Sequence, residues 1–251
     1  MEDFHQKVTE TGYSREIELD FSHCDRNQRM RMGTILTLAA AAAGHDYDAR
    51  GLTYEILYEK REVFLLSRLS VRVHRCPCVR DVLQINTWED GARGAHLQRV
   101  YEYRTRAGEL CISIRSDWIL VDPISRKILR PSQFTARPIT TSGVEIDCPR
   151  PTKVTLPAEA EPLGSRIVRW SDLDGNGHLF SGTYGDIVWD ALPADLQERV
   201  PAEFTINYSR EATLGEELQL LGHREGDSYR MEGLGPNGPC FAALAVFQPQ
   251  K

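Results

Sequence analysis

An internal repeat limits the folds that are open to this chain of 251 residues. Residues 24–36 (CDRNQRMRMGTIL) align with residues 173–185 (LDGNGHLFSGTYG) at a constant offset of 149 positions. Four pairs of positions are identical: Asp25 and Asp174, Asn27 and Asn176, Gly33 and Gly182, and Thr34 and Thr183. A fixed period of this kind indicates that one structural unit occurs twice.

A second alignment follows the first in the same order. Residues 71–85 align with residues 206–220 at an offset of 135 positions. Charged and amide residues correspond at three pairs of positions: Arg75 and Arg210, Asp81 and Glu216, and Gln84 and Gln219. The smaller offset means that the first half carries 14 additional residues between its helix and its next strand.

Each half shows the same order of predicted elements: a strand, a polar loop, a helix and an antiparallel meander. Alternating residues predict the strands, and apolar residues at helical spacing predict the helices. In the first half we expect a helix around residues 35–42 and strands at residues 15–21, 66–75, 82–90, 95–105 and 110–122. In the second half we expect a helix over residues 184–192, ended by Pro193, and strands at residues 165–170, 204–210, 217–225, 228–235 and 240–248.

One helix packed against an antiparallel meander, used twice, predicts an α+β fold. A long helix wrapped by a curved antiparallel sheet is the arrangement of the hotdog fold, so we expect a double hotdog of two tandem units. We place the units at residues 1–140 and 161–251. Residues 141–160 belong to a segment rich in proline and threonine, and are the expected linker.

The composition narrows the class of protein. The formal net charge of -6 argues against nucleic-acid binding, which uses a basic surface. No apolar run approaches the ~20 residues that span a bilayer, and the charged residues 1–10 lack the apolar segment of a signal peptide. We therefore expect a cytoplasmic protein. The six cysteines include no CxxC pair, so we expect free, mostly buried thiols, no metal site and no other cofactor.

The polar loop of the second half, residues 170–184 (WSDLDGNGHLFSGTY), is the candidate for chemistry. Just before the predicted helix it carries Asp172, Asp174, Asn176 and His178. A turn with a helix cap is one explanation. A catalytic loop is the other, because an amide donates hydrogen bonds, an imidazole exchanges protons near neutral pH, and a helix N-terminus offers free N–H groups. We assign Asp172 to the cap and leave the other three residues open at this point.

Glu211 is a second candidate, in the predicted strand of residues 205–213 (TINYSREAT). On a regular strand its side chain shares a face with Ser209 and Thr213. A carboxylate there is suited to act as a general base. The structural alternative is an ion pair with Arg210 or a face turned to solvent.

Three stretches together resemble the acyl-acyl-carrier-protein (acyl-ACP) thioesterases of plants and bacteria. They are SDLDGNGHLFSGTY, INYSREAT and FLLSRLSVRVHRCPCVRDVLQINTWED, and the likeness extends from about Tyr13 to Phe247. No plastid transit segment precedes Met1, which favours a bacterial form. The chain departs from the family where His178 is followed by Leu-Phe-Ser instead of Val-Asn-Asn. It also has Ala212 where the family has cysteine, which excludes a cysteine nucleophile at that position.

The resemblance implies a catalytic network of Asp174, Asn176, His178 and Glu211. Glu211, assisted by His178, would activate water, Asn176 would position substrate or water, and Asp174 would orient the network. The implied reaction is hydrolysis of the thioester of fatty acyl-ACP in fatty acid biosynthesis, with acyl carrier protein as the partner and without a cofactor. The acyl chain would lie in an apolar tunnel, largely within the first unit.

Other functions remain open at this point. An acyl-CoA thioesterase, a dehydratase or hydratase, and a non-catalytic protein that binds acyl groups or the carrier fit the same fold. The duplicated chain already supplies both units of a hotdog pair, so a monomer and a homodimer are both compatible with it. Basic clusters at residues 26–31 and 72–80 are either solvated faces or contacts for an acidic carrier protein.

The repeat also predicts how many active sites the chain holds. In the two alignments Glu211 lies opposite Cys76, and His178 lies opposite Arg29. A guanidinium stays protonated at neutral pH and cannot act as a base. A nucleophilic Cys76 would need a depressed pKa and a neighbouring base, for which His74 is the nearest candidate. We therefore expect one active site, in the second unit, and a first unit that binds the acyl chain.

Overall fold

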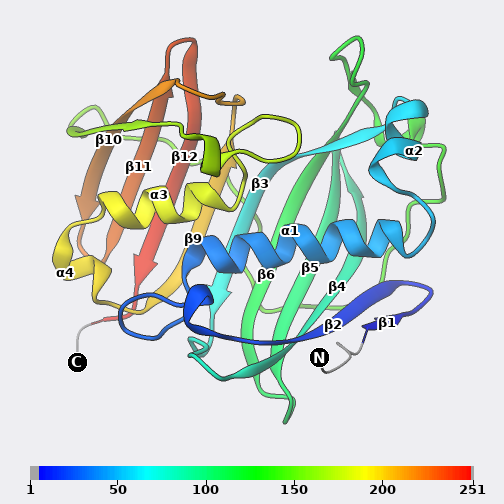
Figure 1. The fold of residues 1–251 in the computed structure, drawn as a ribbon, viewed down its shortest axis with the longest axis horizontal. Helices are drawn as coiled ribbons and strands as arrows, with labels where there is room; N and C mark the ends of the chain where they lie inside the picture. The colour runs from blue at the N-terminus through cyan, green and yellow to red at the C-terminus, as the bar shows by residue number, and fades with distance from the viewer. Residues whose placement is uncertain (1–5, 250–251) are drawn as a thin grey trace.

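The computed structural model describes residues 6–249 and shows a double hotdog fold (Figure 1). Two helices, α1 (Met32–Asp48) and α3 (Thr183–Ala191), lie in front of one curved antiparallel sheet of twelve strands. The α+β class and the tandem arrangement expected from the repeat are confirmed.

The first unit adds a short helix, α2 (Tyr54–Glu59), to α1. Its strands are β1 (Gln6–Val8), β2 (Gly12–Glu18), β3 (Val63–Val73), β4 (Val82–Arg93), β5 (His96–Thr105), β6 (Leu110–Val121) and β7 (Ile128–Leu129). Of these elements, α2 and the two shortest strands were not predicted. These elements are too short to show a clear apolar periodicity, and the prediction relied on that periodicity.

The second unit adds a short helix, α4 (Ala194–Gln197), to α3. Its strands are β8 (Glu161–Ile167), β9 (Pro201–Tyr208), β10 (Glu217–Glu225), β11 (Ser228–Gly235) and β12 (Gly238–Phe247). The bounds of β10 and β11 agree with the predicted ranges. The predicted strand that contained Glu211 is wrong, because β9 ends at Tyr208. Beyond it the backbone N–H groups of Ser209 and Arg210 both donate to the carbonyl of Cys240, at 2.8 and 3.3 Å, and the ladder stops.

The two units share their sheet. The strand order is β1-β2-β4-β5-β6-β3-β9-β12-β11-β10-β8, so β3 of the first unit pairs with β9 of the second at the centre. The pairing runs from Arg68 opposite Asn207 to Arg72 opposite Glu203. The hydroxyl groups of Ser70 and Thr205 lie 3.0 Å apart across this seam. The seam makes one continuous sheet out of two repeats.

The helices differ in length and meet at their N-terminal ends. Helix α1 has 17 residues and α3 has nine, which accounts for part of the additional sequence in the first half. The contact is made by glycines: a Cβ atom on Gly185 would lie 2.9 Å from the backbone nitrogen of Gly33. Close approach of the two helices therefore requires that no side chain stands at this position.

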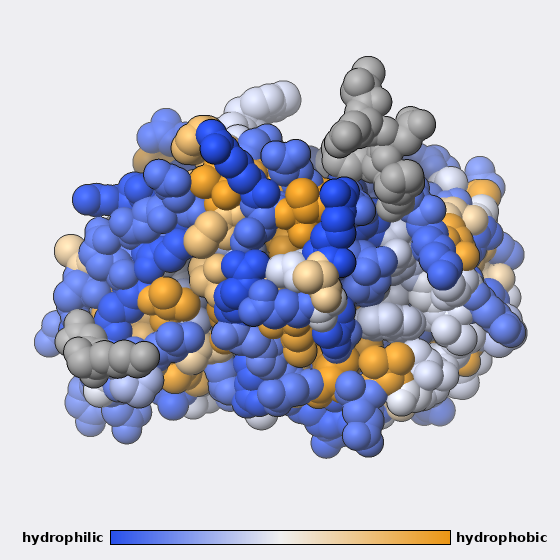
Figure 2. Space-filling view, turned by 90° about the horizontal axis from the view of Figure 1, so that it is seen from below, coloured by the Kyte–Doolittle hydropathy of each residue, from blue (hydrophilic) through white to orange (hydrophobic). Residues whose placement is uncertain are grey.

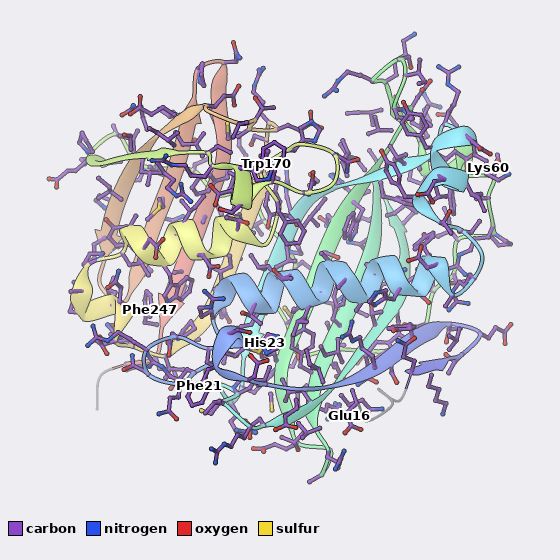
Figure 3. The ribbon with its side chains drawn as sticks, in the orientation of Figure 1. Glu16, Phe21, His23, Lys60, Trp170 and Phe247 are labelled. Atoms are coloured by element: carbon purple, nitrogen blue, oxygen red, sulfur yellow. The ribbon has the colours of Figure 1, made fainter. Side chains whose placement is uncertain are left out.

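The repeat is visible in the hydrogen bonds that fix the two polar loops. The N–H of Met30 donates to the carbonyl of Pro77 at 2.8 Å, and the N–H of Leu179 donates to that of Ala212 at 2.8 Å. Phe21 and Trp170 correspond in the repeat, and Figure 3 shows them on opposite sides of the helix pair. The units are therefore related by a pseudo-twofold axis.

The segment between the units is held against the sheet at several points. The Asn207 side chain accepts a hydrogen bond from the N–H of Val154 at 2.6 Å and donates one to the carbonyl of Thr152 at 2.9 Å. Glu62 accepts from the N–H of Thr135 at 3.0 Å. The limits of the linker at residues 141–160 stay a prediction.

The surface seen from below is mostly hydrophilic, with separate hydrophobic patches near its centre (Figure 2). Within residues 6–249 we find no helix with the length and apolar character that a membrane crossing requires.

Candidate active site

The polar loop of the second unit starts with a short 3-10 turn (Trp170–Asp172) that Asp172 fixes. The buried carboxylate accepts a hydrogen bond from the backbone N–H of Arg169 at 2.7 Å. The guanidinium of Arg166 donates to both carboxylate oxygens, at 2.8 and 2.9 Å. Asp172 thus has a structural role, but it caps this short turn and not α3 as expected, because the N-cap of α3 is Gly182. The anchor holds the start of the loop.

Asp174 shapes the rest of the loop through the backbone. Its Oδ1 accepts hydrogen bonds from the N–H groups of Asn176 at 2.8 Å and His178 at 3.2 Å. Gly177 has a φ of 81°, a left-handed conformation that favours glycine. The loop is therefore a tight turn. One carboxylate oxygen thus fixes the backbone of both Asn176 and His178, which agrees with an orienting role for Asp174.

His178 and Glu211 lie together. The distance between His178 Nε2 and Glu211 Oε2 is 3.4 Å, and each side chain is 31% exposed. An antiparallel bridge between His178 and Thr213, next to the hydrogen bond from Leu179 to Ala212, places the two segments side by side. The predicted proximity follows from backbone pairing of the loop with the segment after β9, and not from alternation along a strand.

Arg126 is a site residue that the sequence did not suggest. Its Nη2 donates to Glu211 Oε2 at 2.6 Å from the turn between β6 and β7, 85 positions away in sequence. The guanidinium is largely exposed, so the pair is screened by solvent. Nothing in the local sequence around Arg126 distinguishes it from the other arginines of the chain. Its contact places a positive charge next to the Glu211 carboxylate.

Asn176 lies at the edge of a cavity of about 420 Å³ in the first unit. The cavity is lined largely by α1, α2 and strands β3 to β6, and its walls are mainly apolar. The apolar side chains that line it come from Ala40, Ala43, Leu52, Leu57, Val63, Phe64, Leu97, Trp118, Phe134 and Ile139. The site therefore combines a polar cluster from the second unit with an apolar space in the first, the arrangement expected for an acyl thioester.

The equivalent loop of the first unit has the same backbone hydrogen bonds but a different side chain at the position of His178. Asp25 Oδ1 accepts from the N–H groups of Asn27 at 2.8 Å and Arg29 at 2.9 Å, as Asp174 does in the second unit. The Arg29 guanidinium, in the place of the imidazole, donates to the carbonyls of Gln197 at 3.4 Å and Glu198 at 3.0 Å. Arg29 thus ties the loop to the end of α4.

Cys76 has none of the features that a nucleophile needs. Burial raises the pKa of its thiol to about 12, and the thiol donates weakly to the carbonyl of Pro77 at 3.8 Å. His74 lies beyond the end of β3 and contacts the Ser113 hydroxyl at 3.0 Å. A neutral thiol is a poor nucleophile, which favours a single active site.

Five arginines of the basic clusters at residues 26–31 and 72–80 form ion pairs within the chain. Their ion pairs are Arg26 with Glu198, Arg29 with Asp25, Arg31 with Asp186, Arg72 with Glu203, and Arg75 with Asp81 and Glu109. The role of these clusters stays a prediction.

Within the described part of the chain, no group of three or more His, Cys, Asp or Glu side chains is arranged to hold a metal ion.

Both halves of the chain match a known family. The acyl-ACP thioesterase N-terminal domain matches residues 10–134, and the acyl-ACP thioesterase C-terminal domain matches residues 159–235. The chain belongs to the acyl-ACP thioesterase family. The family assignment expected from the three sequence stretches is confirmed.

Two of the related sequences come from plants. The chain is 24% identical over 186 residues to the chloroplastic palmitoyl-acyl carrier protein thioesterase of Arabidopsis thaliana, a match that covers 69% of this chain and 44% of the relative. It is 27% identical over 192 residues to the chloroplastic dodecanoyl-[acyl-carrier-protein] hydrolase of Cinnamomum camphora, covering 72% and 49%. The matches span less than half the length of these relatives.

Solved structures share the fold of this acyl-ACP thioesterase family member. An acyl-ACP thioesterase from Bacteroides thetaiotaomicron has a TM-score of 0.85 at 21% identity, covering 94% of this chain and 98% of the other. The 12:0-ACP thioesterase from Umbellularia californica has a TM-score of 0.78 at 16% identity, covering 97% and 100%. At these identities the likeness shows the double hotdog fold.

Proposed function

We propose that the chain hydrolyses the thioester of fatty acyl-acyl carrier protein and releases a free fatty acid. The observation that carries the proposal is the contact of Glu211 with His178, which lies two positions along the loop from Asn176, a residue that lines an apolar cavity. A thioester substrate needs both a base for water and a place for its acyl chain, and these two parts adjoin here.

The proposed reaction uses Glu211 and His178 as an acid–base pair. The pair accepts a proton from water as the water oxygen bonds to the acyl carbonyl carbon. The carbon–sulfur bond then breaks, and the proton passes to the departing thiolate, so the products are a carboxylic acid and a thiol. The Asn176 amide donates to the substrate carbonyl or to the water. Asp174 holds the loop that carries Asn176 and His178.

Direct attack by water is the route that we favour over a covalent acyl-enzyme. The residue after Glu211 is Ala212, so no thiol is available at that position. Arg126 donates a hydrogen bond to Glu211 Oε2 at 2.6 Å, which favours one orientation of the carboxylate towards the attacking water.

The test is the release of free thiol from acyl-ACP and from acyl-CoA with the same acyl group. We expect wild-type turnover with acyl-ACP and a loss on the order of 100-fold or more in Glu211→Gln. Glu217→Gln, an exposed carboxylate on β10, is the matched control and should retain the wild-type rate. Turnover of acyl-CoA alone would make the chain an acyl-CoA thioesterase. Binding of acyl-ACP without thiol release would make it a carrier-binding protein.

A further inference from the structure

The depth of the acyl cavity follows from the order of strands in the sheet. From the seam outwards the first unit runs β3-β6-β5-β4. The cavity is lined on β3 by Phe64, on β6 by Trp118, on β5 by Leu97 and Arg99, and on β4 by Glu89. Since β3 adjoins the second unit, which holds the catalytic pair, β4 lies at the far end. The lining thus changes from apolar near the site to charged away from it.

The far end is a buried cluster of ions. Arg99 is 4% exposed and its Nη2 donates to Asp46 Oδ2 on α1 at 2.9 Å. Glu89 lies directly opposite Arg99 in the β4–β5 ladder, 3.7 Å from the same nitrogen. Arg137, from the segment after β7, approaches Glu89 to 2.5 Å. Tyr47, which also lines the cavity, donates its hydroxyl to Glu89 at 2.8 Å.

Every charge in this cluster has a partner from the chain itself. Glu89 also accepts hydrogen bonds from the hydroxyl and the N–H of Thr140, at 2.7 and 3.2 Å. Burial alone would raise the pKa of the Glu89 carboxyl, but the hydrogen bonds from Arg137 and Thr140 and the charge of Arg99 lower it to about 2. The carboxylate is therefore ionised at neutral pH. An alkyl chain that pushes into paired, buried ions loses their interactions and gains no apolar contact.

We propose that the ion cluster of Asp46, Arg99, Glu89 and Arg137 closes the acyl cavity and sets the longest acyl chain that the site accepts. The inference rests on the proposed function, since it concerns the acyl group of the same substrate. Three steps between strands span about 14 Å from β3 to β4. An extended chain advances about 1.2 Å per bond, so this depth corresponds to on the order of ten carbons. The substrate class is an acyl group of medium length.

The first measurement is a saturated acyl-ACP series from hexanoyl to octadecanoyl. In wild type, kcat/KM should rise by up to about fourfold for each methylene that enters apolar space, and then fall once the chain reaches the cluster. Affinity for the matching free fatty acids, measured by calorimetry, should show the same limit. A rate and an affinity that keep rising to octadecanoyl would overturn the inference.

The second measurement uses a variant in which part of the ion cluster is replaced by apolar side chains. The double variant Glu89→Met/Arg137→Met removes one charge of each sign, which avoids leaving an unpaired buried ion. We expect its optimum to shift to acyl groups at least two carbons longer. The matched control is Asp90→Met/Arg115→Met. This pair is 3.1 Å apart, is similarly buried on the same sheet, and lies outside the cavity lining. It should keep the wild-type optimum.

A variant that fills the cavity covers the case in which the double variant does not fold. Gly44 lines the cavity on α1, and a Cβ atom there meets no atom within 4 Å. Gly44→Leu should fold and should lower kcat/KM for the longest accepted chain at least tenfold more than for hexanoyl. If Gly44→Leu keeps the wild-type dependence of kcat/KM on acyl-chain length, the acyl group does not bind in this cavity. Absence of thiol release at every chain length would instead refute the proposed hydrolysis. In that case the fatty-acid affinities still test whether the ion cluster limits the length of the bound chain.

Discussion

Acid should destabilise the fold through Glu89. The pKa of this carboxyl falls from an ordinary 4.5 to about 2 in the folded chain, against the effect of burial, because Arg137, Thr140 and Arg99 favour the ionised form. The unfolded chain binds the proton at higher pH than the folded chain does. The contribution to stability is therefore complete above pH 4.5 and is lost as the pH falls towards 2. It amounts to about 3 kcal/mol at neutral pH, of which about 2 kcal/mol is lost by pH 3.

Urea unfolding at neutral pH and at about pH 3 measures this contribution. Glu89→Gln removes the titrating group, so between these two pH values its free energy of unfolding should fall by about 2 kcal/mol less than that of wild type. The variant will be less stable at neutral pH, by about 3–5 kcal/mol for a broken buried pair, so only the pH differences are compared. Glu217→Gln should keep the wild-type pH dependence. Equal pH dependence in wild type and Glu89→Gln would refute the reasoning.

Three further outcomes are expected. His178→Ala should cost little additional turnover in a Glu211→Gln background, because the two side chains act as one unit; kinetics in which the single losses multiply would count against a shared network. Cys76→Ala should leave turnover nearly intact, and a large loss without a change in stability would show that the first unit performs chemistry. Gly185→Ala should destabilise the chain by about 1–3 kcal/mol in urea unfolding, because its Cβ would meet the Gly33 nitrogen at 2.9 Å; wild-type stability would contradict this account of the helix contact.

The sequence predicted elements best where a local pattern decides them. Strict alternation in β10 and β11 was enough for their bounds, since each strand has one buried face. The repeat predicted the tandem fold because Asp25 and Asn27 have the same spacing as Asp174 and Asn176. This equal spacing reflects one type of turn that occurs twice in the chain. The end of β9 was not predictable, because it depends on a shared carbonyl from β12, far away in sequence.

The candidate site shows the same division. Asp174 and His178 stand in one loop, so their association could be inferred from a single stretch of sequence. The approach of Arg126 to Glu211 depends on how a turn of the first unit lies over the second, which no spacing encodes. The ion cluster was missed for a related reason. Glu89 and Arg99 become partners only through the β4–β5 register, and their strands read as ordinary alternation.

The pairing of β3 with β9 has a consequence for how the two halves change over time. In a symmetric dimer of identical subunits, every substitution appears twice, once at each copy of a site. Here the two copies are encoded separately, so an imidazole at one position and a guanidinium at its equivalent are independent choices. One half is free to enlarge its cavity with a longer helix while the other keeps the acid–base pair. Because both halves stay in one sheet, this division of labour does not depend on protein concentration.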